Sequence, residues 1–547
     1  MVHSTPYKNV YIHGPIKDAL ETLRQNVYMP HASITVKVEQ DSQSNPPVRN
    51  YTFQGAPKLE KIKCTYQDNA LKDLPTQNSL LKIISQSRFE SLKTLEFSCC
   101  QDYTGMTVDL KNVFSINRKL TTLKLMWSNC ASEKVDFSIV LNALSSITSK
   151  YLRILHLKKV CFTALMGFKM LLKNVKIEKL VITGSHRFKN KANVLNMLLE
   201  IIASTTKSLR VFKFSDILKT STTSYGLLYK IFEENQNIQV LHLNKNNWTN
   251  GEHLDAIADS DLNLLKDLDI SDTYIRNSRN DVLTKIVSVN KYLKKIKLDK
   301  TKLSMNTLAN ITSKKPVNLK QLSLKKCKYL NMSGAQSIKS LLELNNNIRV
   351  LNLEGDFFVN NEQLMAIIDS NVSTLVTLNL SNTDIKKYDS ESLFQIFEVN
   401  KFLKHVDLSY NDGLCGQQII AIADSKASKL KTLNMKSTGI TPHLDSELRR
   451  VLSQSNTLFS IDLSHNEQIP ITFLQAIINS RIRTLQALSI KRTNITLSNK
   501  TFSHFLTMLK SNMYLIDIEV ETAISLPLKT LRKNPRKIII NNVLNYV

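Results

Sequence analysis

Hydrophobic residues recur along the chain in the pattern L-x-x-L-x-L, in which Ile, Val, Phe, Met or Cys also occupy the apolar positions. The intervals between copies average about 28.5 residues. A fixed period of this length is the signature of a repeat array and not of several compact domains. The first apolar residues of the seventeen copies are Leu59, Leu92, Leu120, Leu152, Ile177, Leu209, Ile238, Leu265, Leu293, Leu319, Ile348, Leu375, Leu403, Leu430, Leu458, Leu485 and Leu515.

A second, longer period begins at Ile238, because the alternate copies at Ile238, Leu293, Ile348, Leu403 and Leu458 are each separated by 55 residues. Two repeat types therefore alternate. Four similar segments lie at multiples of this period and indicate that a helical half is repeated with the apolar half. These segments are Ala256–Ser260, Ala366–Ser370, Ala421–Ser425 and Ala476–Ser480.

Polar residues also return in phase with the double period. Asn235, Asn290, Asn345 and Asn400 each precede a copy by three residues. We expect them to adopt the left-handed conformation where a helix ends and a strand begins, since Asn tolerates it best after Gly. The ninth position carries a short polar residue that can satisfy backbone groups at the end of the strand. It is Asn246, Thr301, Asp356, Asn411 and Asn466 in one type, and Thr273, Cys327, Thr383, Thr438 and Thr493 in the other.

The pattern L-x-x-L-x-L-x-x-(N/T/C), in two alternating types, resembles the ribonuclease-inhibitor-like class of leucine-rich repeat proteins over residues 59–540. The resemblance implies an α/β solenoid of about seventeen repeats. Parallel strands would line its concave face and helices its convex face around one continuous core. Proteins of this class include inhibitors, actin regulators, GTPase activators and ubiquitin-ligase adaptors, so the fold leaves the function open.

The spacing predicts three regions. Residues 1–58 are expected to form an N-terminal cap and residues 59–520 the solenoid, irregular over 59–237 and regular over 238–520. Residues 521–547 would form a C-terminal cap in which Ile538–Ile540 supply a last strand. Exposed ends of a stacked core need such polar caps.

Composition changes this picture mainly through charge. The chain has 42% hydrophobic residues and only 12 Gly and 12 Pro among 547 residues, which excludes collagen-like and disordered classes. No window of about 18 uncharged apolar residues occurs, and residues 1–17 lack the apolar core of a secretory signal. Seven Cys without metal-ligand spacing indicate reduced thiols. We expect a cytoplasmic or nuclear protein, with a formal net charge of +27.

Much of that charge lies between Lys291 and Lys328, where twelve Lys accompany one acidic residue, Asp299. The x positions of each copy should face the concave side, so this segment predicts a docking patch for an acidic protein, a phosphoinositide surface or nucleic acid. A merely solvated basic face is the alternative. The candidate partner-binding lysines are Lys294, Lys295, Lys297, Lys300, Lys320, Lys325 and Lys326.

Stacking in register would place three of these lysines beside carboxylates of the preceding repeat. The predicted pairs are Asp267 with Lys295, Asp269 with Lys297, and Asp272 with Lys300. Each exposed pair would contribute only about 0.2–1 kcal/mol. A smaller basic group on the strand expected after Leu152 consists of Arg153, His156, Lys158 and Lys159.

Large side chains at concave positions form a second candidate interface. Tyr410, Phe459, His405 and His465 belong to strands of one repeat type, and exposed aromatics often dominate protein interfaces. His405 and His465 lie two strands apart, too far for shared metal ligation.

No motif supplies chemistry: the P-loop, dinucleotide-binding, zinc-protease and nucleophile-elbow patterns do not occur. We therefore predict no catalytic, metal or cofactor residues, and a non-enzymatic scaffold that binds a partner protein on its concave face. An electrostatic binder of membrane or nucleic acid is the first alternative. The basic segment lacks interleaved aromatics, which disfavours single-stranded nucleic acid. An actin regulator or ubiquitin-ligase adaptor is the second alternative, although residues 1–58 show no F-box pattern.

Overall fold

The computed structural model divides into two compact units, residues Met1–Tyr274 (unit 1) and Ile275–Val547 (unit 2). The residues that the structure describes are 10–14, 34–38, 61–66, 92–99, 106–127, 150–159, 165–184, 192–217, 225–246, 251–273, 280–301, 319–327, 334–355, 361–370, 372–383, 390–414, 416–424, 429–441, 445–454, 457–469, 473, 484–493, 517–522 and 537–542.

Unit 1 is a parallel sheet in which each strand pairs with the next along the chain. Its described strands are β1 Val10–Gly14, β2 Ile34–Val38, β3 Lys61–Tyr66, β4 Thr94–Cys99, β5 Thr122–Trp127, β6 Ile154–Lys158, β7 Lys179–Thr183, β8 Val211–Ser215, β9 Val240–His242 and β10 Asp267–Asp269. Its described helices are α3 Met106–Ile116, α5 Leu165–Asn174, α6 Ala192–Thr205, α7 Tyr225–Glu234 and α8 Glu252–Asp259.

Unit 2 repeats this organisation, with parallel strands that each pair with the next along the chain. Its described strands are β11 Lys295–Lys297, β12 Gln321–Ser323, β13 Val350–Asn352, β14 Thr377–Asn379, β15 His405–Asp407, β16 Thr432–Asn434, β17 Ser460–Asp462, β18 Ala487–Ser489, β19 Asp517–Thr522 and β20 Lys537–Asn542. Its described helices are α9 Asn280–Val289, α11 Gly334–Leu344, α12 Asn361–Asp369, α13 Ser390–Val399, α14 Gly416–Asp424 and α15 Asp445–Gln454.

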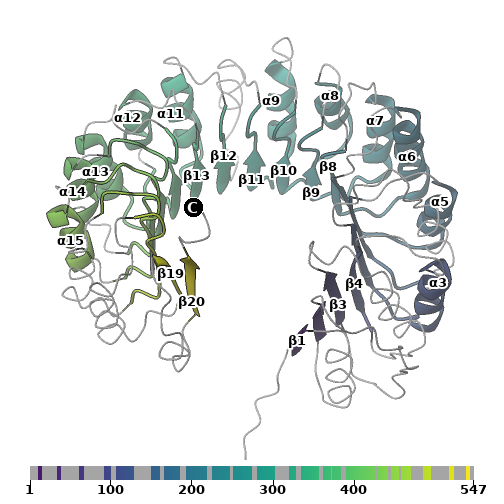
Figure 1. Ribbon diagram of the computed structural model, residues 1–547. Coiled ribbons are helices and arrows are strands. Elements are labelled where there is room, and N and C mark those ends of the chain that lie inside the picture. The colour runs from purple at the N-terminus through teal and green to yellow at the C-terminus, as the bar shows by residue number, and fades with distance from the viewer. Residues whose placement is uncertain are drawn as a thin grey trace, which may run out of the picture. The chain divides into compact units, whose positions relative to one another are not determined.

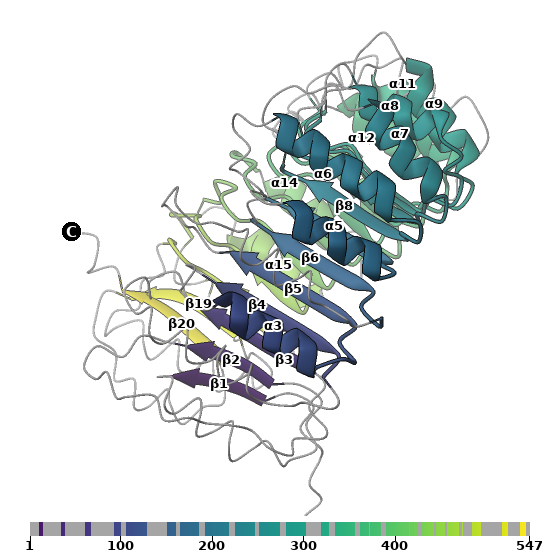
Figure 2. The same cartoon turned by 90° about the vertical axis from the view of Figure 1, so that its right-hand side faces the viewer.

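In each unit the helices lie on one side of the strands, and the opposite face of the sheet carries no described helix (Figures 1 and 2). The apolar residues at positions 1, 4 and 6 of each repeat point into the space between these layers. In the first repeat of unit 2, Leu293, Ile296 and Leu298 are buried, and α9 adds Leu283 and Ile286 from the helix side. Burying such a side chain contributes roughly 1.5–3 kcal/mol, so the repeated apolar positions hold strands and helices together.

A strand begins two residues after each of the seventeen apolar starts, from β3 after Leu59 to β19 after Leu515. The prediction of a leucine-rich repeat solenoid with parallel strands is therefore confirmed. β20 is the expected last strand over Ile538–Ile540. The segments expected to be caps also contribute to the sheet, because β1 pairs with β2, and β2 pairs with β3. The boundaries of the caps stay a prediction.

Each strand from β6 to β18 is followed by a turn whose residue at position 8 has a positive φ angle, a conformation that few side chains adopt readily. The residues at this position include Asp272, Lys300, Lys326, Asn382, Tyr410, Ser437, His465 and Arg492, and glycine replaces them at Gly184 and Gly355. A Cβ atom at Gly355 would lie 2.5 Å from Cγ of Lys326, so glycine is needed there for space as well. The left-handed position is thus set by the repeat and not by a Gly or Asn preference.

The prediction for the phased Asn residues was wrong in its mechanism. Asn235, Asn290, Asn345 and Asn400 do not have positive φ angles. Instead, each is buried and its side-chain amide donates to the carbonyl four residues earlier at the end of the helix. In two of them the side-chain oxygen also accepts a backbone N–H at the start of the preceding strand, Leu209 for Asn235 and Leu375 for Asn400.

The prediction for position 9 is confirmed for the described residues. Oδ1 of Asn411 accepts the N–H of Thr383 at 2.8 Å, and its amide donates to the carbonyls of Leu380 and Leu408. Asn246 and Asn466 repeat this bridge. The Thr hydroxyls of the other repeat type donate to the carbonyl three residues earlier. Asp356 lies outside the described residues.

Candidate functional site

The open face of the unit 2 sheet is the candidate binding surface. Along most strands of this face the burial alternates, so that position 4 is buried while positions 3 and 5 are partly exposed; in β12, Ser323 at position 5 is buried as well. The side chains at positions 2, 3, 5, 7 and 8 therefore supply the chemistry of this face. Because the strands pair residue for residue, equivalent positions of neighbouring repeats form rows across the sheet.

The predicted lysines gather on the first two repeats of unit 2. We call Lys294, Lys295, Lys297, Lys300, Lys320, Lys325 and Lys326 the basic cluster. The N–H of Lys320 donates to the carbonyl of Lys294 at 2.8 Å, and the N–H of Lys300 donates to the carbonyl of Lys325 at 2.7 Å, so the two repeats are in direct register. Lys300 and Lys326 are exposed in the left-handed turns that follow the strands, and not on the strands themselves.

Two carboxylates accompany the basic cluster and both are engaged. Glu354 pairs with Nζ of Lys325 at 2.7 Å and also accepts the side-chain amide of Asn379. Asp299 accepts the backbone N–H of Lys325 at 3.1 Å and the hydroxyl of Ser323. Lys325 is therefore neutralised by a carboxylate, while the basic cluster as a whole keeps an excess of positive charge.

The three predicted pairs between Asp267, Asp269 or Asp272 and the lysines join residues of different units, and they stay a prediction. Within unit 1, Asp267 already lies 3.3 Å from Nε2 of His242, and Asp269 accepts the N–H of Ser271.

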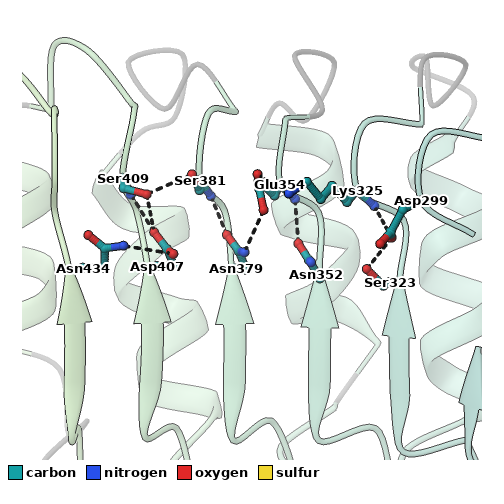
Figure 3. Close-up of polar contacts among 10 residues, drawn as sticks. All are labelled: Asp299, Ser323, Lys325, Asn352, Glu354, Asn379, Ser381, Asp407, Ser409 and Asn434. Atoms are coloured by element: carbon teal, nitrogen blue, oxygen red, sulfur yellow. Dashed lines mark hydrogen bonds and ion pairs between the residues drawn. The ribbon is translucent and has the colours of Figure 1, made fainter. Parts of the chain in front are cut away.

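A polar ladder continues from the basic cluster across the strands that follow (Figure 3). At position 5, Asn352, Asn379, Asp407 and Asn434 each accept the backbone N–H two residues ahead, which fixes the turn after the strand. Neighbouring repeats are joined by the hydroxyls of Ser381 and Ser409 at 2.9 Å, and by the amide of Asn434 with Asp407 at 3.1 Å. The ladder uses its polar groups internally, so it orders the face more than it offers free ligand contacts.

The predicted aromatic and histidine group is not a single cluster. His405 is the first residue of β15 and Phe459 immediately precedes β17, whereas Tyr410 and His465 occupy the left-handed turns after these strands. The expectation that all four lie on strands was therefore wrong. Tyr410 is 51% exposed and lies 5.2 Å from Nζ of Lys436. Nδ1 of His405 lies 2.9 Å from Oγ1 of Thr432 on the next strand.

Electrostatics around His405 indicate its protonation state. Burial lowers the pKa of His405, and the positive charges of Lys431 and Lys404 lower it further. The ring therefore favours its neutral form at physiological pH.

One row of cations extends much further than the segment from Lys291 to Lys328. The residues at position 2, directly before the strands, form what we call the amino-edge row: Lys294, Lys320, Arg349, Val376, Lys404, Lys431, Phe459 and Gln486. Arg349, Lys404 and Lys431 were missed in the sequence, although they occupy one fixed position of the repeat. Comparing that position across all repeats would have found them, because charge spread over 28-residue intervals does not form a local run.

The basic group of unit 1 is partly neutralised. Arg153 pairs with Glu178 at 3.5 Å, and Lys159 adopts the left-handed turn after β6. His156 is half-buried. Burial is the first cause that lowers its pKa to about 4, and the positive charges of Lys124, Lys158 and Lys179 lower it further. Two strands away, Glu96 on β4 lies 3.1 Å from Lys63 and 3.3 Å from Lys124.

The described residues contain no group of three or more His, Cys, Asp or Glu that could hold a metal ion. Cys327 is a buried free thiol whose Sγ lies 3.1 Å from the carbonyl of Leu298. None of the helices in the described part of the chain is long and apolar enough to cross a membrane.

Comparisons with known proteins give structural likeness only. No family model and no curated protein matches the sequence. An internalin from Listeria monocytogenes is 17% identical with a TM-score of 0.36, and the match covers 75% of this chain and 88% of that one. LegL7, a leucine-rich repeat-containing protein from Legionella pneumophila, is 17% identical with a TM-score of 0.36, covering 50% of this chain and 90% of that one.

A yeast Rad7–Elc1 complex is 13% identical with a TM-score of 0.38, and 83% of each chain is covered. Since these TM-scores are all low, the assignment of this chain as a leucine-rich repeat protein rests on its own repeated strands, turns and helices.

Proposed function

We propose that this chain is a non-enzymatic scaffold that docks an acidic segment of a partner protein on the open face of unit 2, through the basic cluster. The observation that carries the proposal is the imbalance of charge: seven lysines on two paired repeats accompany two carboxylates, Asp299 and Glu354, which already have partners. Opposite charge on a partner would speed encounter and fix its orientation.

Rigidity of the face supports the same proposal. Lys300 and Lys326 project from turns whose backbone is held by the neighbouring repeats, since their N–H groups donate to the carbonyls of Lys325 and Glu354. A preordered surface loses little conformational entropy on binding, which leaves more of the contact energy for affinity. None of the described residues favours an actin-regulatory or a ubiquitin-ligase function. The cytoplasmic or nuclear location stays a prediction.

The test removes two exposed charges from the basic cluster. In Lys300→Asn with Lys326→Asn the backbone is preserved, because Asn tolerates the left-handed conformation of both positions. We expect the affinity for a poly-Glu peptide, measured by fluorescence anisotropy, to fall about 2- to 30-fold, as for two exposed ion pairs. The control Arg449→Gln with Arg450→Gln removes the same charge from the exposed side of α15 and should bind like the wild type.

A capture experiment then separates a protein partner from the alternatives. Lysate treated with nuclease and detergent is passed over the wild type and both variants, and the retained proteins are identified by mass spectrometry. A protein held by the wild type and by the α15 control, but not by the Lys300/Lys326 variant, supports the proposal. Equal retention by all three chains would overturn it.

A further inference from the structure

The amino-edge row is one continuous line of residues across eight consecutive strands of unit 2. Each backbone N–H in the row donates to the carbonyl of its predecessor, from Lys320 to Lys294 at 2.8 Å through Phe459 to Lys431 at 2.7 Å and Gln486 to Phe459 at 2.8 Å. Paired strands lie about 4.8 Å apart, so the six steps from Lys294 to Phe459 span roughly 29 Å. Strands β11, β12 and β13, which carry the first part of the row, are labelled in Figure 1.

Charge in the row has a single sign. Five of its eight residues are cationic, none is acidic, and none of these five has an ion-pair partner among the described residues: Lys294, Lys320, Arg349, Lys404 and Lys431. Like charges directly opposite each other on neighbouring strands destabilise a sheet. A ligand with regularly spaced negative charges would remove this repulsion along the whole row.

Exposed aromatic rings accompany the cations at one end. Phe459 continues the row beyond Lys431 and is 43% exposed. Phe402, two residues before Lys404, is 52% exposed, and Nζ of Lys429 lies 5.1 Å from its ring. Single-stranded nucleic acids are bound by this combination, in which a basic track holds phosphates and aromatic faces stack with bases.

A ligand can contact the amino-edge row only through the side chains. From Lys320 to Gln486 every backbone N–H at this position already donates within the sheet, so an added peptide strand would find no free main-chain donors there. Only side-chain charge and aromatic faces remain, and these match a polyphosphate chain with bases.

We propose that the amino-edge row binds single-stranded nucleic acid, with phosphates along Lys294, Lys320, Arg349, Lys404 and Lys431 and a base stacked on Phe459. This goes beyond the scaffold function, which is assigned to the basic cluster and tested at Lys300 and Lys326 in the turns. The row shares Lys294 and Lys320 with that cluster, so the test uses residues that belong to the row alone.

Fluorescence anisotropy with a labelled ten-nucleotide oligouridylate, a length within the usual site size of about 4–16 nucleotides, measures the affinity of the full chain between 50 and 300 mM KCl. Five phosphate contacts predict a slope of about −3.5 for log affinity against log salt, and Lys404→Gln with Lys431→Gln should reduce it to about −2.1. Phe459→Ala should weaken binding about fivefold or more without changing the slope. The Arg449→Gln, Arg450→Gln control should bind the oligonucleotide with the same affinity and salt slope as the wild type.

His405 offers an independent readout, because Lys404 and Lys431 flank it on the same face. A phosphate bound there would raise the pKa of His405, seen as a shift in the titration of its ring by NMR in the full chain. The Lys300→Asn, Lys326→Asn variant should keep the wild-type salt dependence of oligonucleotide binding and the pKa shift of His405. A wrong proposal for the row can therefore be distinguished from a wrong proposal for the scaffold function.

Three results would overturn the proposal: an unchanged salt slope in the Lys404/Lys431 variant, equal loss of binding in the α15 control, or no effect of Phe459→Ala. If a poly-Glu peptide binds more tightly than the oligonucleotide, and the Lys404/Lys431 variant loses this peptide binding, the row would be assigned to an acidic protein instead. Circular dichroism spectra that match the wild type confirm that each variant is folded.

Discussion

Buried asparagines connect neighbouring repeats at two levels of the fold. At the end of the strand, Asn411 bridges Thr383, Leu380 and Leu408, and at the end of the helix, Asn400 bridges Ile396 and Leu375. Side-chain amides are suited to this role because one group both donates and accepts. Each Asn therefore satisfies backbone groups that strands of three residues leave unpaired.

Replacing Asn411 with Ala should leave the N–H of Thr383 and the carbonyl of Leu408 buried without the partner that Asn411 supplies, whereas the carbonyl of Leu380 keeps the hydroxyl of Thr383. Each such group costs about 1–3 kcal/mol, so we expect the free energy of unfolding of unit 2 to fall by about 2–4 kcal/mol. Urea unfolding followed by circular dichroism measures the loss. Asn347→Ala, at an exposed position after α11, should change the free energy by less than about 0.5 kcal/mol. Equal midpoints for the two variants would show that the bridge is dispensable.

Single residues also mark the limit of what the sequence could predict. Position 9 was interpreted correctly, because Asn and Thr have few roles at the end of a buried strand. The left-handed position was not, because Lys300, Tyr410 and His465 give no conformational signal of their own. The neighbouring repeats impose that backbone through hydrogen bonds of about 2.8 Å, and a single-residue preference does not reveal such contacts.

At the scale of elements, the strands were predictable and the surfaces were not. Every apolar start is followed by a strand because three buried positions per repeat give a strong periodic signal. The amino-edge row depends instead on which residues meet across strands that are 26 to 29 residues apart in sequence. The strands β4 to β8 are five or six residues long and β9 to β18 only three, a difference that coincides with the irregular spacing before Ile238.

Helix α8 gives unit 1 a built-in sensitivity to acid. His253 is fully buried, and burial lowers its pKa to about 3, whereas the unfolded value is about 6.5. Between these pH values the unfolded chain binds a proton that the folded chain does not. The free energy of unfolding should therefore fall by about 1.4 kcal/mol for each pH unit as the pH decreases. His156 acts in the same direction down to about pH 4.

Tryptophan fluorescence can follow this effect, because both tryptophans of the sequence, Trp127 and Trp248, fall within unit 1. When denaturation is measured at several pH values from 7 to 4.5, the free energy of unfolding should depend less on pH in His253→Leu, which places an apolar side chain of similar size at this buried position. Adding His156→Gln to this variant should reduce the pH dependence of the free energy of unfolding further. An unchanged pH dependence in His253→Leu would mean that the ring is protonated in the folded chain.

At the scale of the whole molecule, a net charge of +27 is distributed over two units with different local balance. In unit 1, carboxylates such as Glu96 and Glu178 are paired with cations on the sheet. In unit 2, the amino-edge row carries five cations without ion pairs among the described residues. Repulsion should thus be concentrated in unit 2, where an anionic ligand would relieve it.

Salt should consequently stabilise unit 2 by screening this repulsion, since the row spacing of about 4.8 Å lies well within the Debye length of about 30 Å at 0.01 M but exceeds that of about 3 Å at 1 M. The Lys404→Gln, Lys431→Gln variant removes one adjacent like-charged pair, worth about 0.2–1 kcal/mol. Its melting temperature at 20 mM KCl should exceed that of the wild type by about 1–3 °C, and the difference should shrink at 0.5 M. Circular dichroism follows the melting transition of the full chain. A lower melting temperature for the variant at 20 mM KCl would show that these lysines already have stabilising partners.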